Sequence, residues 1–385
     1  MSKRKICVVV TARPSYARVK TALQAIKNHP NLELQLVLAG SALLDRYGSA
    51  IKVIEKDGFK VTEKIYNVLE GETPTAMAKT TGIAIMELAT TFANLKPDIV
   101  VTIADRFETI ATSIAASYQN IPLAHIQGGE VTGNIDEKVR HANTKLADIH
   151  LVASEDARKR VLKMGEDDSM VINTGCPSMD IAREVLENPE FDFDPLIKYG
   201  GVGDEINWRD GYLVVMQHPV TTEFEKSREH VTTTLEVINE LKIPTFWFWP
   251  NVDAGSDGTS KGIRTFREKY KSSHIHFFKN MEPQDFLRLI KNSKCLIGNS
   301  SVGIRESAFL GIPVVNIGTR QHGRHRAKSV IDCGYDKQEI KNAIEKHLSN
   351  GHYESEFIYG DGFAGQKIAD SLATCKLRFH KTITY

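Results

Sequence analysis

Acidic side chains at two places in the chain are candidates for proton transfer. Asp105 follows an apolar, β-branched run, and Glu130, Asp136 and Glu137 lie close together further along. A carboxylate just beyond the carboxyl end of a buried strand can act as a general base. Structural alternatives stay open for each place, because Asp105 can be the N-cap of the next helix and Asp136 and Glu137 can complement a helix dipole.

The second acidic segment also carries basic residues at helical spacing. Arg140 and His141 lie four residues after Asp136 and Glu137, so a helix brings each acid beside a base on one face. The pair Gly128–Gly129, just upstream, lets a ligand approach the backbone closely. The pattern is equally typical of a solvated ion pair worth a few tenths of a kcal/mol, roughly.

A different set of residues suits the binding of an anion. Arg13 lies in the turn after the first apolar run, where its guanidinium can hold a phosphate or carboxylate by two hydrogen bonds. Ser300, Ser301 and Gly303 open a predicted helix, where hydroxyls, backbone N–H groups and the positive helix end converge. A surface arginine and an ordinary serine N-cap are the alternatives, although one cap leaves the second serine and the glycine unexplained.

Three further candidates follow or neighbour apolar runs. His218 can donate a hydrogen bond to a diphosphate, although a lone histidine is more often a structural group. Glu306, in the predicted helix after the serines, can accept hydrogen bonds from ribose hydroxyls. Arg320 belongs to a basic cluster at 320–326, which is typical of an anion-binding rim or of a solvated loop. No cysteine or acid at ligand spacing accompanies the histidines there, so the pattern disfavours a metal site.

Short apolar runs alternating with amphipathic segments position these residues. Near-continuous apolar strands separated by helices indicate parallel sheets covered on both faces. The alternation lapses at 188–211, which is rich in Pro, Gly and Asp, and we interpret this stretch as a connection between two domains. Helices are predicted at Tyr16–Asn28, Glu282–Asn292 and Ile304–Leu310. The predicted strands are Lys5–Thr11, Leu32–Ala39, Asp98–Ile103, Pro122–Ile126, Ile149–Ala153, Tyr212–Met216, Thr245–Trp249, His274–Phe278, Cys295–Ile297 and Pro313–Ile317.

The composition narrows the class of protein. At about 150 residues per domain, 385 residues predict two or three domains. With 49 Lys and Arg against 48 Asp and Glu, the charge balance argues against a dedicated nucleic-acid or membrane binder. Five scattered cysteines without a CxxC pair indicate neither a disulfide framework nor a zinc ribbon. The apolar run Ile6–Val10 is too short for a signal peptide or a membrane span, so we expect a soluble, cytoplasmic protein.

The motifs, taken together and in this order, resemble those of UDP-N-acetylglucosamine 2-epimerases. The similarity runs from Lys5 to about residue 375, and it is greatest to the hydrolysing branch that makes N-acetylmannosamine for sialic and other nonulosonic acids. The segments that carry it are TARPSYARVK (11–20), DRFE (105–108), HIQGGEVTGNIDEKVRH (125–141), HPVTT (218–222), NSSVGIRE (299–306) and GTRQ (318–321).

This resemblance implies the fold called GT-B, an α/β architecture in which two Rossmann-like, doubly wound domains face a central cleft. Residues 1–190 would carry the sugar site and catalytic acids, and residues 211–365 would bind UDP. Residues 366–385 would pack back towards the first domain.

The resemblance also implies a mechanism: anti-elimination of UDP across C1–C2 gives a glycal, and water then adds to it. No metal or redox cofactor is required. Relatives commonly carry a catalytic Glu where this chain has Gln127, which cannot take a proton, so either another acid covers that role or the substrate differs. The predicted catalytic residues are Asp105, Gln127, Glu130, Asp136, Glu137 and His218, and the predicted substrate-binding residues are Arg13, Arg140, His141, Ser300, Ser301, Gly303, Glu306 and Arg320.

The implied partners are a UDP-sugar substrate, the UDP product and further copies of the chain in a homodimer or homotetramer; no nucleic acid or membrane is expected. The sugar stays open between UDP-N-acetylglucosamine and a UDP-diacetamido-trideoxy sugar of the bacillosamine type. Three other functions also stay open: a non-hydrolysing epimerase, a GT-B glycosyltransferase, and a non-catalytic sugar-nucleotide sensor, which Gln127 makes conceivable.

Overall fold

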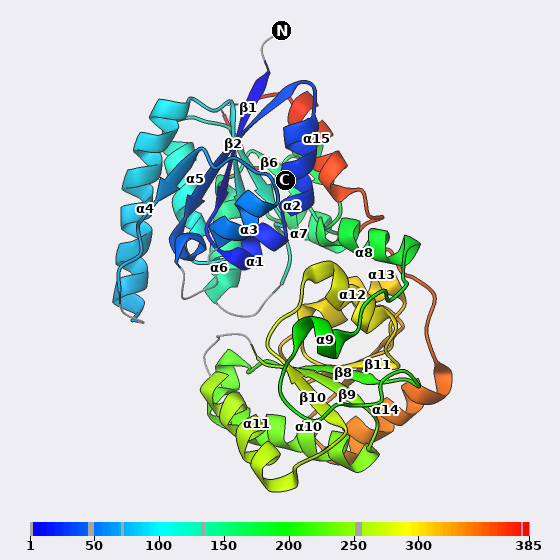
Figure 1. Ribbon diagram of the computed structural model, residues 1–385. Coiled ribbons are helices and arrows are strands. Elements are labelled where there is room, and N and C mark those ends of the chain that lie inside the picture. The colour runs from blue at the N-terminus through cyan, green and yellow to red at the C-terminus, as the bar shows by residue number, and fades with distance from the viewer. Residues whose placement is uncertain are drawn as a thin grey trace. The chain divides into compact units, whose positions relative to one another are not determined.

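Two parallel β-sheets organise the chain, one in each of two units (Figure 1). The computed structural model describes residues 3–44, 50–70, 73–131, 135–250, 256–378 and 380–384, without the side chains at 135, 136, 221 and 222. One unit comprises Met1–Asp180 and Tyr359–Tyr385, and the other comprises Ile181–Ile358. Among the described residues, no helix is both long and apolar enough to cross a membrane.

The first unit is built on a seven-stranded sheet in the order β3-β2-β1-β4-β5-β6-β7. Every pairing in it is parallel, and the strand order reverses between β1 and β4. Ligands of open α/β sheets bind beyond the carboxyl ends of the strands at such a reversal. The strands are β1 Arg4–Val10, β2 Leu32–Ala39, β3 Glu63–Ile65, β4 Ile99–Ile103, β5 Leu123–Ile126, β6 Ile149–Val152 and β7 Val171–Asn173.

Helices cover both faces of this sheet, because alternate residues of a strand point to opposite faces. In β1, Ile6 and Val8 pack in the cluster that contains Leu23 of α2, whereas Cys7 packs with Phe92 of α4. The helices of this unit are α1 Arg13–Ala17, α2 Lys20–Asn28, α3 Ala50–Lys56, α4 Pro74–Leu95, α5 Thr109–Tyr118, α6 Ile135–Leu146, α7 Glu155–Lys163 and α15 Ala364–Thr374, and α8 Ser178–Glu187 spans the boundary between the units.

The last helix, α15, packs beside α2 (Figure 1). The Asp180 carboxylate caps its first turn by accepting hydrogen bonds from the backbone N–H groups of Ala364 at 2.7 Å and Gly365 at 2.8 Å. A Cβ atom on Gly365 would lie 2.7 Å from the backbone of Thr21, so glycine is needed for this close helix contact.

The second unit is built on a six-stranded parallel sheet in the order β10-β9-β8-β11-β12-β13. Its core packs Leu213 and Val215 of β8 against Leu235 of α10 and Ile344 of α14. The strands are β8 Leu213–Met216, β9 Thr245–Phe248, β10 Ile275–Phe278, β11 Cys295–Gly298, β12 Val314–Ile317 and β13 Val330–Cys333. The helices are α9 Pro195–Tyr199, α10 Ser227–Leu241, α11 Ser256–Tyr270, α12 Pro283–Lys291, α13 Glu306–Leu310 and α14 Lys337–Asn350, with 3-10 turns at Thr221–Lys226 and Ser301–Gly303.

The prediction of two doubly wound, parallel α/β domains is confirmed. Two predicted helices differ: Tyr16–Asn28 is divided between α1 and α2 by Arg18 and Val19, and the helix predicted at Ile304–Leu310 begins at Glu306. The stretch predicted as an interdomain connection also differs, because it packs as part of the second unit.

Aromatic side chains explain why this stretch, 188–211, packs on the second unit. Phe191 lies 5.3 Å from Trp208, and Trp208 lies 6.4 Å from Phe246 of β9, measured between ring centroids. Val202 and Phe277 of β10 exchange backbone hydrogen bonds, each 2.9 Å long. The Pro, Gly and Asp content of the segment therefore indicates irregular backbone here, and not a free linker.

Candidate active site

Candidate residues of both units lie at the carboxyl ends of neighbouring strands. In the first unit they follow β1, β4 and β5, which are adjacent in the sheet, and in the second unit they follow β8, β11 and β12. This is the edge at which open α/β sheets bind ligands.

A buried ion pair dominates the edge of the first unit. The Asp105 carboxylate pairs with the guanidinium of Arg140, and the two side chains are 10% and 2% exposed. The Nη1 atom of Arg140 donates a hydrogen bond of 2.8 Å to the backbone carbonyl of Glu130, and Arg18 lies 3.8 Å from the Asp105 carboxylate. The alternative of Asp105 as a helix N-cap is wrong, because α5 begins only at Thr109.

Two backbone turns beside this pair adopt an unusual conformation. Ala104 and Gln127 directly follow β4 and β5, and their φ angles are 57° and 65°, in the left-handed region. Such a conformation costs of order 1–3 kcal/mol for a residue other than glycine and is concentrated at functional sites. The buried Gln127 side chain donates a hydrogen bond of 3.1 Å to the Sγ atom of Cys176.

A buried histidine supports the turn that carries Asp105. The Nε2 atom of His125 lies 2.9 Å from the Ala104 carbonyl, and its Nδ1 atom lies 3.1 Å from the Thr144 hydroxyl. Burial lowers the pKa of His125 to about 3, although its bond to the Ala104 carbonyl opposes the shift. The ring is therefore neutral, and Nε2 carries its proton because a carbonyl can only accept a hydrogen bond.

The remaining charged candidates of the first unit lie on α6, just before it, and at the start of α1. Glu137 and His141 pair at 3.3 Å with four-residue spacing, as predicted, and both are partly exposed. Glu130 is buried. Arg13 is half-buried at the start of α1, and no residue of the described ranges forms an ion pair or hydrogen bond with its guanidinium. The side chain of Asp136 lies outside the described residues.

One asparagine joins the strand ends of the second unit. Asn299, after β11, accepts a hydrogen bond of 2.7 Å from the backbone N–H of His218 and donates one of 2.9 Å to its carbonyl. The Asn299 carbonyl accepts hydrogen bonds from Arg320 at 3.2 Å and Gln321 at 2.8 Å. The ends of β8, β11 and β12 are thereby tied together.

The imidazole of His218 is a neutral group at this edge. Burial and the nearby charge of Arg320 lower the pKa of His218 to about 3. A neutral imidazole can donate one hydrogen bond to an anion. It is not the protonated imidazolium that could act as a general acid at neutral pH.

The serine-rich turn after β11 differs in part from the prediction. It is a 3-10 turn. The hydroxyl of Ser300 accepts a hydrogen bond of 3.4 Å from the backbone N–H of Val302, and the hydroxyl of Ser301 accepts one of 3.3 Å from the guanidinium of Arg305. Helix α13 begins only at Glu306, whose Oε2 atom is buried and has no hydrogen-bond partner among the described residues.

Two neighbouring residues of the second unit also have structural roles. A Cβ atom on Gly303 would lie 3.0 Å from Val314, so packing accounts for this glycine. In the basic cluster, Arg326 pairs with Asp332 at 2.6 Å and donates hydrogen bonds to backbone carbonyls, so it stabilises the loop itself.

Several residues that contact the candidate site were not predicted from the sequence. Arg18, Asn299 and Cys176 contact predicted site residues, and His125 contacts the residue before Asp105. None of these four is among the predicted site residues, although all except Cys176 lie within the motifs that carry the resemblance. Asn299 alone had a usable signal, since a small polar residue between a strand and two serines is a natural link in a strand-end turn. The partners of the others lie far away in the sequence.

Comparison with known proteins identifies relatives of this chain. The family described as UDP-N-acetylglucosamine 2-epimerase matches residues 24–373. The UDP-N-acetylglucosamine 2-epimerase of Neisseria meningitidis serogroup B is 31% identical, over 94% of this chain and 91% of that protein. The GDP/UDP-N,N'-diacetylbacillosamine 2-epimerase (hydrolyzing) of Campylobacter jejuni is 32% identical, over 90% and 88%.

The fold is also similar to that of solved structures. The crystal structure of the UDP-GlcNAc 2-epimerase of Neisseria meningitidis bound to UDP-GlcNAc superimposes with a TM-score of 0.76 at 20% identity, covering 96% of this chain and 99% of that chain. With the family match over most of its length and this shared fold, the chain belongs to the UDP-N-acetylglucosamine 2-epimerase family.

Proposed function

We propose that this protein is a hydrolysing 2-epimerase, which converts UDP-N-acetylglucosamine and water to N-acetylmannosamine and UDP. The observation that carries the proposal is the buried Asp105 carboxylate, held by Arg140 at the strand-order reversal of the first sheet in a member of this family. The hydrolysing mode is supported by the name of the Campylobacter jejuni relative.

Departure of UDP is the demanding step, because the C2 proton becomes acidic only as the C1–O bond stretches. Charge then develops on the diphosphate, and donors placed around it stabilise the transition state. We assign this task to Arg13, Arg320 and the neutral His218, with the serine hydroxyls of 300–301 beside them. The Oε2 atom of Glu306, which has no hydrogen-bond partner in the described part of the chain, suits a ribose hydroxyl.

Asp105 then removes the C2 proton, giving a glycal, and water adds to it with inversion at C2. General base catalysis contributes about 10²–10⁴-fold to such a step. Arg140 fixes the carboxylate in place, and an acid among Glu130, Asp136 and Glu137 assists hydration. In this assignment the first unit binds the sugar and the second binds UDP, and the working form is a homodimer or homotetramer.

The sugar has a second candidate, because Gln127 cannot take a proton. A UDP-diacetamido-trideoxy sugar of the bacillosamine type is favoured by the 32% identical relative, which is named for such a substrate. It would undergo the same elimination and hydration. The hydrogen bond from Gln127 to Cys176 holds the amide in this position for either sugar.

Proton and phosphorus NMR of the protein with each UDP-sugar in D2O tests the proposal. We expect free UDP and the C2-inverted sugar carrying deuterium at C2. Retention of UDP on the product would indicate a non-hydrolysing epimerase. Turnover only with an added acceptor would indicate a glycosyltransferase, and calorimetric binding without turnover would indicate a sensor.

A further inference from the structure

The last residues of the chain form a strap across the first unit, on the side where β5 and β6 begin. We call residues 376–384, without position 379, the C-terminal strap. Arg378 pairs with Asp167, and the backbone N–H of Thr384 donates a hydrogen bond of 3.0 Å to the carbonyl of Gly165. A Cβ atom on Gly165 would lie 2.8 Å from Ile383, so the strap packs directly on this turn.

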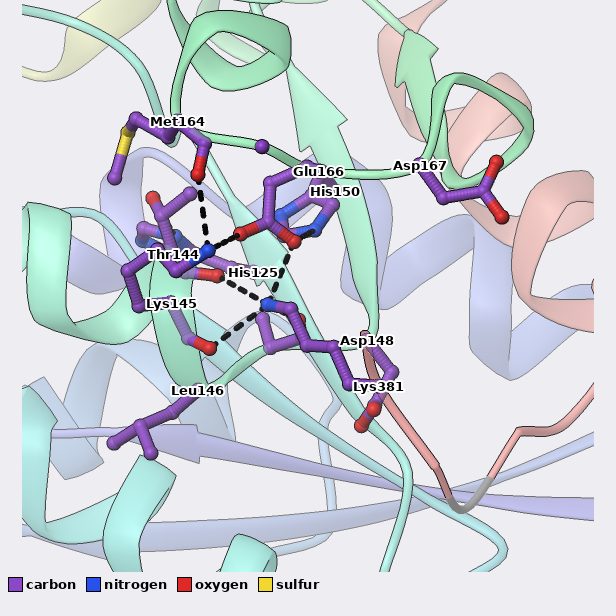
Figure 2. A network of polar contacts seen from close by, with 12 residues as sticks. His125, Thr144, Lys145, Leu146, Asp148, His150, Met164, Glu166, Asp167 and Lys381 are labelled. Carbon is purple, nitrogen blue, oxygen red and sulfur yellow. Dashed lines mark hydrogen bonds and ion pairs between the residues drawn. The ribbon is translucent and has the colours of Figure 1, made fainter. Parts of the chain in front are cut away.

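The side chain of Lys381 extends from the strap to the end of α6 (Figure 2). Its Nζ atom donates hydrogen bonds to the carbonyls of Thr144 at 3.1 Å, Lys145 at 2.8 Å and Ala147 at 2.6 Å. The last carbonyls of a helix have no partner within it and form its negative end. An ammonium group at this place therefore caps α6 by hydrogen bonds and by charge.

A buried carboxylate holds the ammonium group there. Glu166 lies 2.6 Å from Lys381, 2.6 Å from Lys145 and 2.9 Å from His150 (Figure 2). Burial raises the pKa of Glu166, but hydrogen bonds from these three side chains outweigh burial and lower it to about 2. Glu166 is therefore a permanent anion that fixes the position of Lys381.

The capped last turn of α6 is connected to the candidate site through Thr144. The Thr144 hydroxyl lies 3.1 Å from both the His125 ring and the Arg140 carbonyl. His125 supports the Ala104 carbonyl, directly before Asp105, and Arg140 pairs with Asp105 one helical turn before Thr144. A shift of the last turn of α6 would thus move the partners of Asp105.

We propose that Lys381 is a positioning residue of the epimerase reaction: by capping α6 from the C-terminal strap, it holds Arg140 and His125 where they orient Asp105. The inference rests on the proposed function, because it takes Asp105 as the base. A misplacement of about 1 Å can lower turnover by about 10²-fold, so a helix cap far from the reacting atoms can influence the rate.

Substitution with chemical rescue tests this role. Lys381→Ala is expected to lower kcat about 10-fold while KM changes less than about twofold, because ground-state binding is kept. Lys381 lines a cavity of about 340 Å³ together with Asp148 and Arg378, so a small cation can reach the vacated place. Added ethylammonium should restore kcat in a saturable manner, whereas neutral acetamide should not.

A matched control and a measurement independent of activity complete the test. Lys376→Ala removes an exposed lysine of the same strap and should leave kcat unchanged. In Lys381→Ala, amide hydrogens of residues 144–147 should exchange faster, and ethylammonium should slow them again. If the alanine variant fails to fold, Lys381→Met keeps the aliphatic stem, and the kcat and hydrogen-exchange criteria apply to it without the rescue step.

A wild-type kcat in the variant, or a loss that ethylammonium does not reverse, would overturn the positioning role. Failure of the proposed function would be distinguishable from failure of the positioning role. In that case the wild-type protein converts neither UDP-sugar, whereas hydrogen exchange still reports whether Lys381 caps α6.

Discussion

The strand-end edges of the two units use opposite kinds of groups. In the first unit the central contact is a buried pair of full charges, Asp105 and Arg140, beside two residues in left-handed turns. In the second unit the central contacts are made by an amide, Asn299, and by an imidazole that burial keeps neutral, His218.

This difference corresponds to two different tasks. Burying an ion pair carries a desolvation penalty that often exceeds its own attraction, so the pair is poor evidence for stability and better evidence for a site that needs a fixed charge. An edge with neutral donors beside the cationic Arg320 suits a ligand that brings its own negative charge, such as a diphosphate. The first edge is therefore expected to govern turnover, and the second to govern binding.

The largest effect is expected for Asp105→Asn, which keeps the shape of the side chain and removes the proposed base. We expect kcat to fall by about 10²–10⁴-fold while the affinity for UDP changes less than about twofold. Steady-state kinetics and calorimetry measure the two quantities. Asp168→Asn, at a 70% exposed position of the same unit, is the control. Near-normal turnover in Asp105→Asn would remove it from the mechanism.

The reverse pattern is expected at the second edge. Arg320→Ala should weaken UDP binding by about 10–100-fold, because a hydrogen bond to a charged group contributes about 1.5–3 kcal/mol. The kcat value should change less than the affinity does. Arg264→Ala, at an exposed position of α11, serves as the matched control. An affinity for UDP equal to that of the control variant would contradict the assignment.

A carboxylate introduced at position 127 tests whether the first edge can accommodate a further buried charge. Gln127→Glu replaces the donor to Cys176 with a buried carboxylate, and we expect a loss of about 1–3 kcal/mol in the free energy of unfolding at pH 7. Burial raises the pKa of such a carboxyl, so the loss should shrink as the pH falls towards 4. Urea unfolding measures both effects, with the exposed Gln366→Glu as the charge-matched control.

The smallest effect concerns the neutral histidine of the second edge. The folded-state pKa of His218, about 3, lies below the usual value of about 6.5, so the unfolded chain binds more protons between these pH values. Stability is therefore fully present above about pH 6.5 and is lost as the pH falls towards 3. From pH 6.5 to 5.5, the wild type should lose about 1 kcal/mol more than His218→Asn does.

Urea unfolding at several pH values measures this difference, with His322→Asn, an exposed histidine of the same unit, as the control. Equal pH dependence in the wild type and His218→Asn would show that this imidazole is not held neutral by the fold.

The central strands were predictable and the edge strands were not. Strands such as β1, β4 and β11 are buried on both faces, so their sequences are continuous apolar runs whose ends were predicted to within one residue. By contrast, β3, β7 and β13 have three or four residues of mixed burial, and no run or alternation distinguishes them from loops.

Local spacing also predicted the pair of Glu137 and His141, because residues four apart meet on any helix. It could not predict that Arg140 pairs with Asp105, that Gln127 bonds to Cys176, or that Lys381 caps α6. The fold class and the polar residues that follow the strands can be predicted from the amino-acid sequence, since both depend on local hydrophobic patterns. Which of these groups meet is visible only in the folded chain, because their separation in space depends on strand order and on helix packing between segments far apart in the sequence.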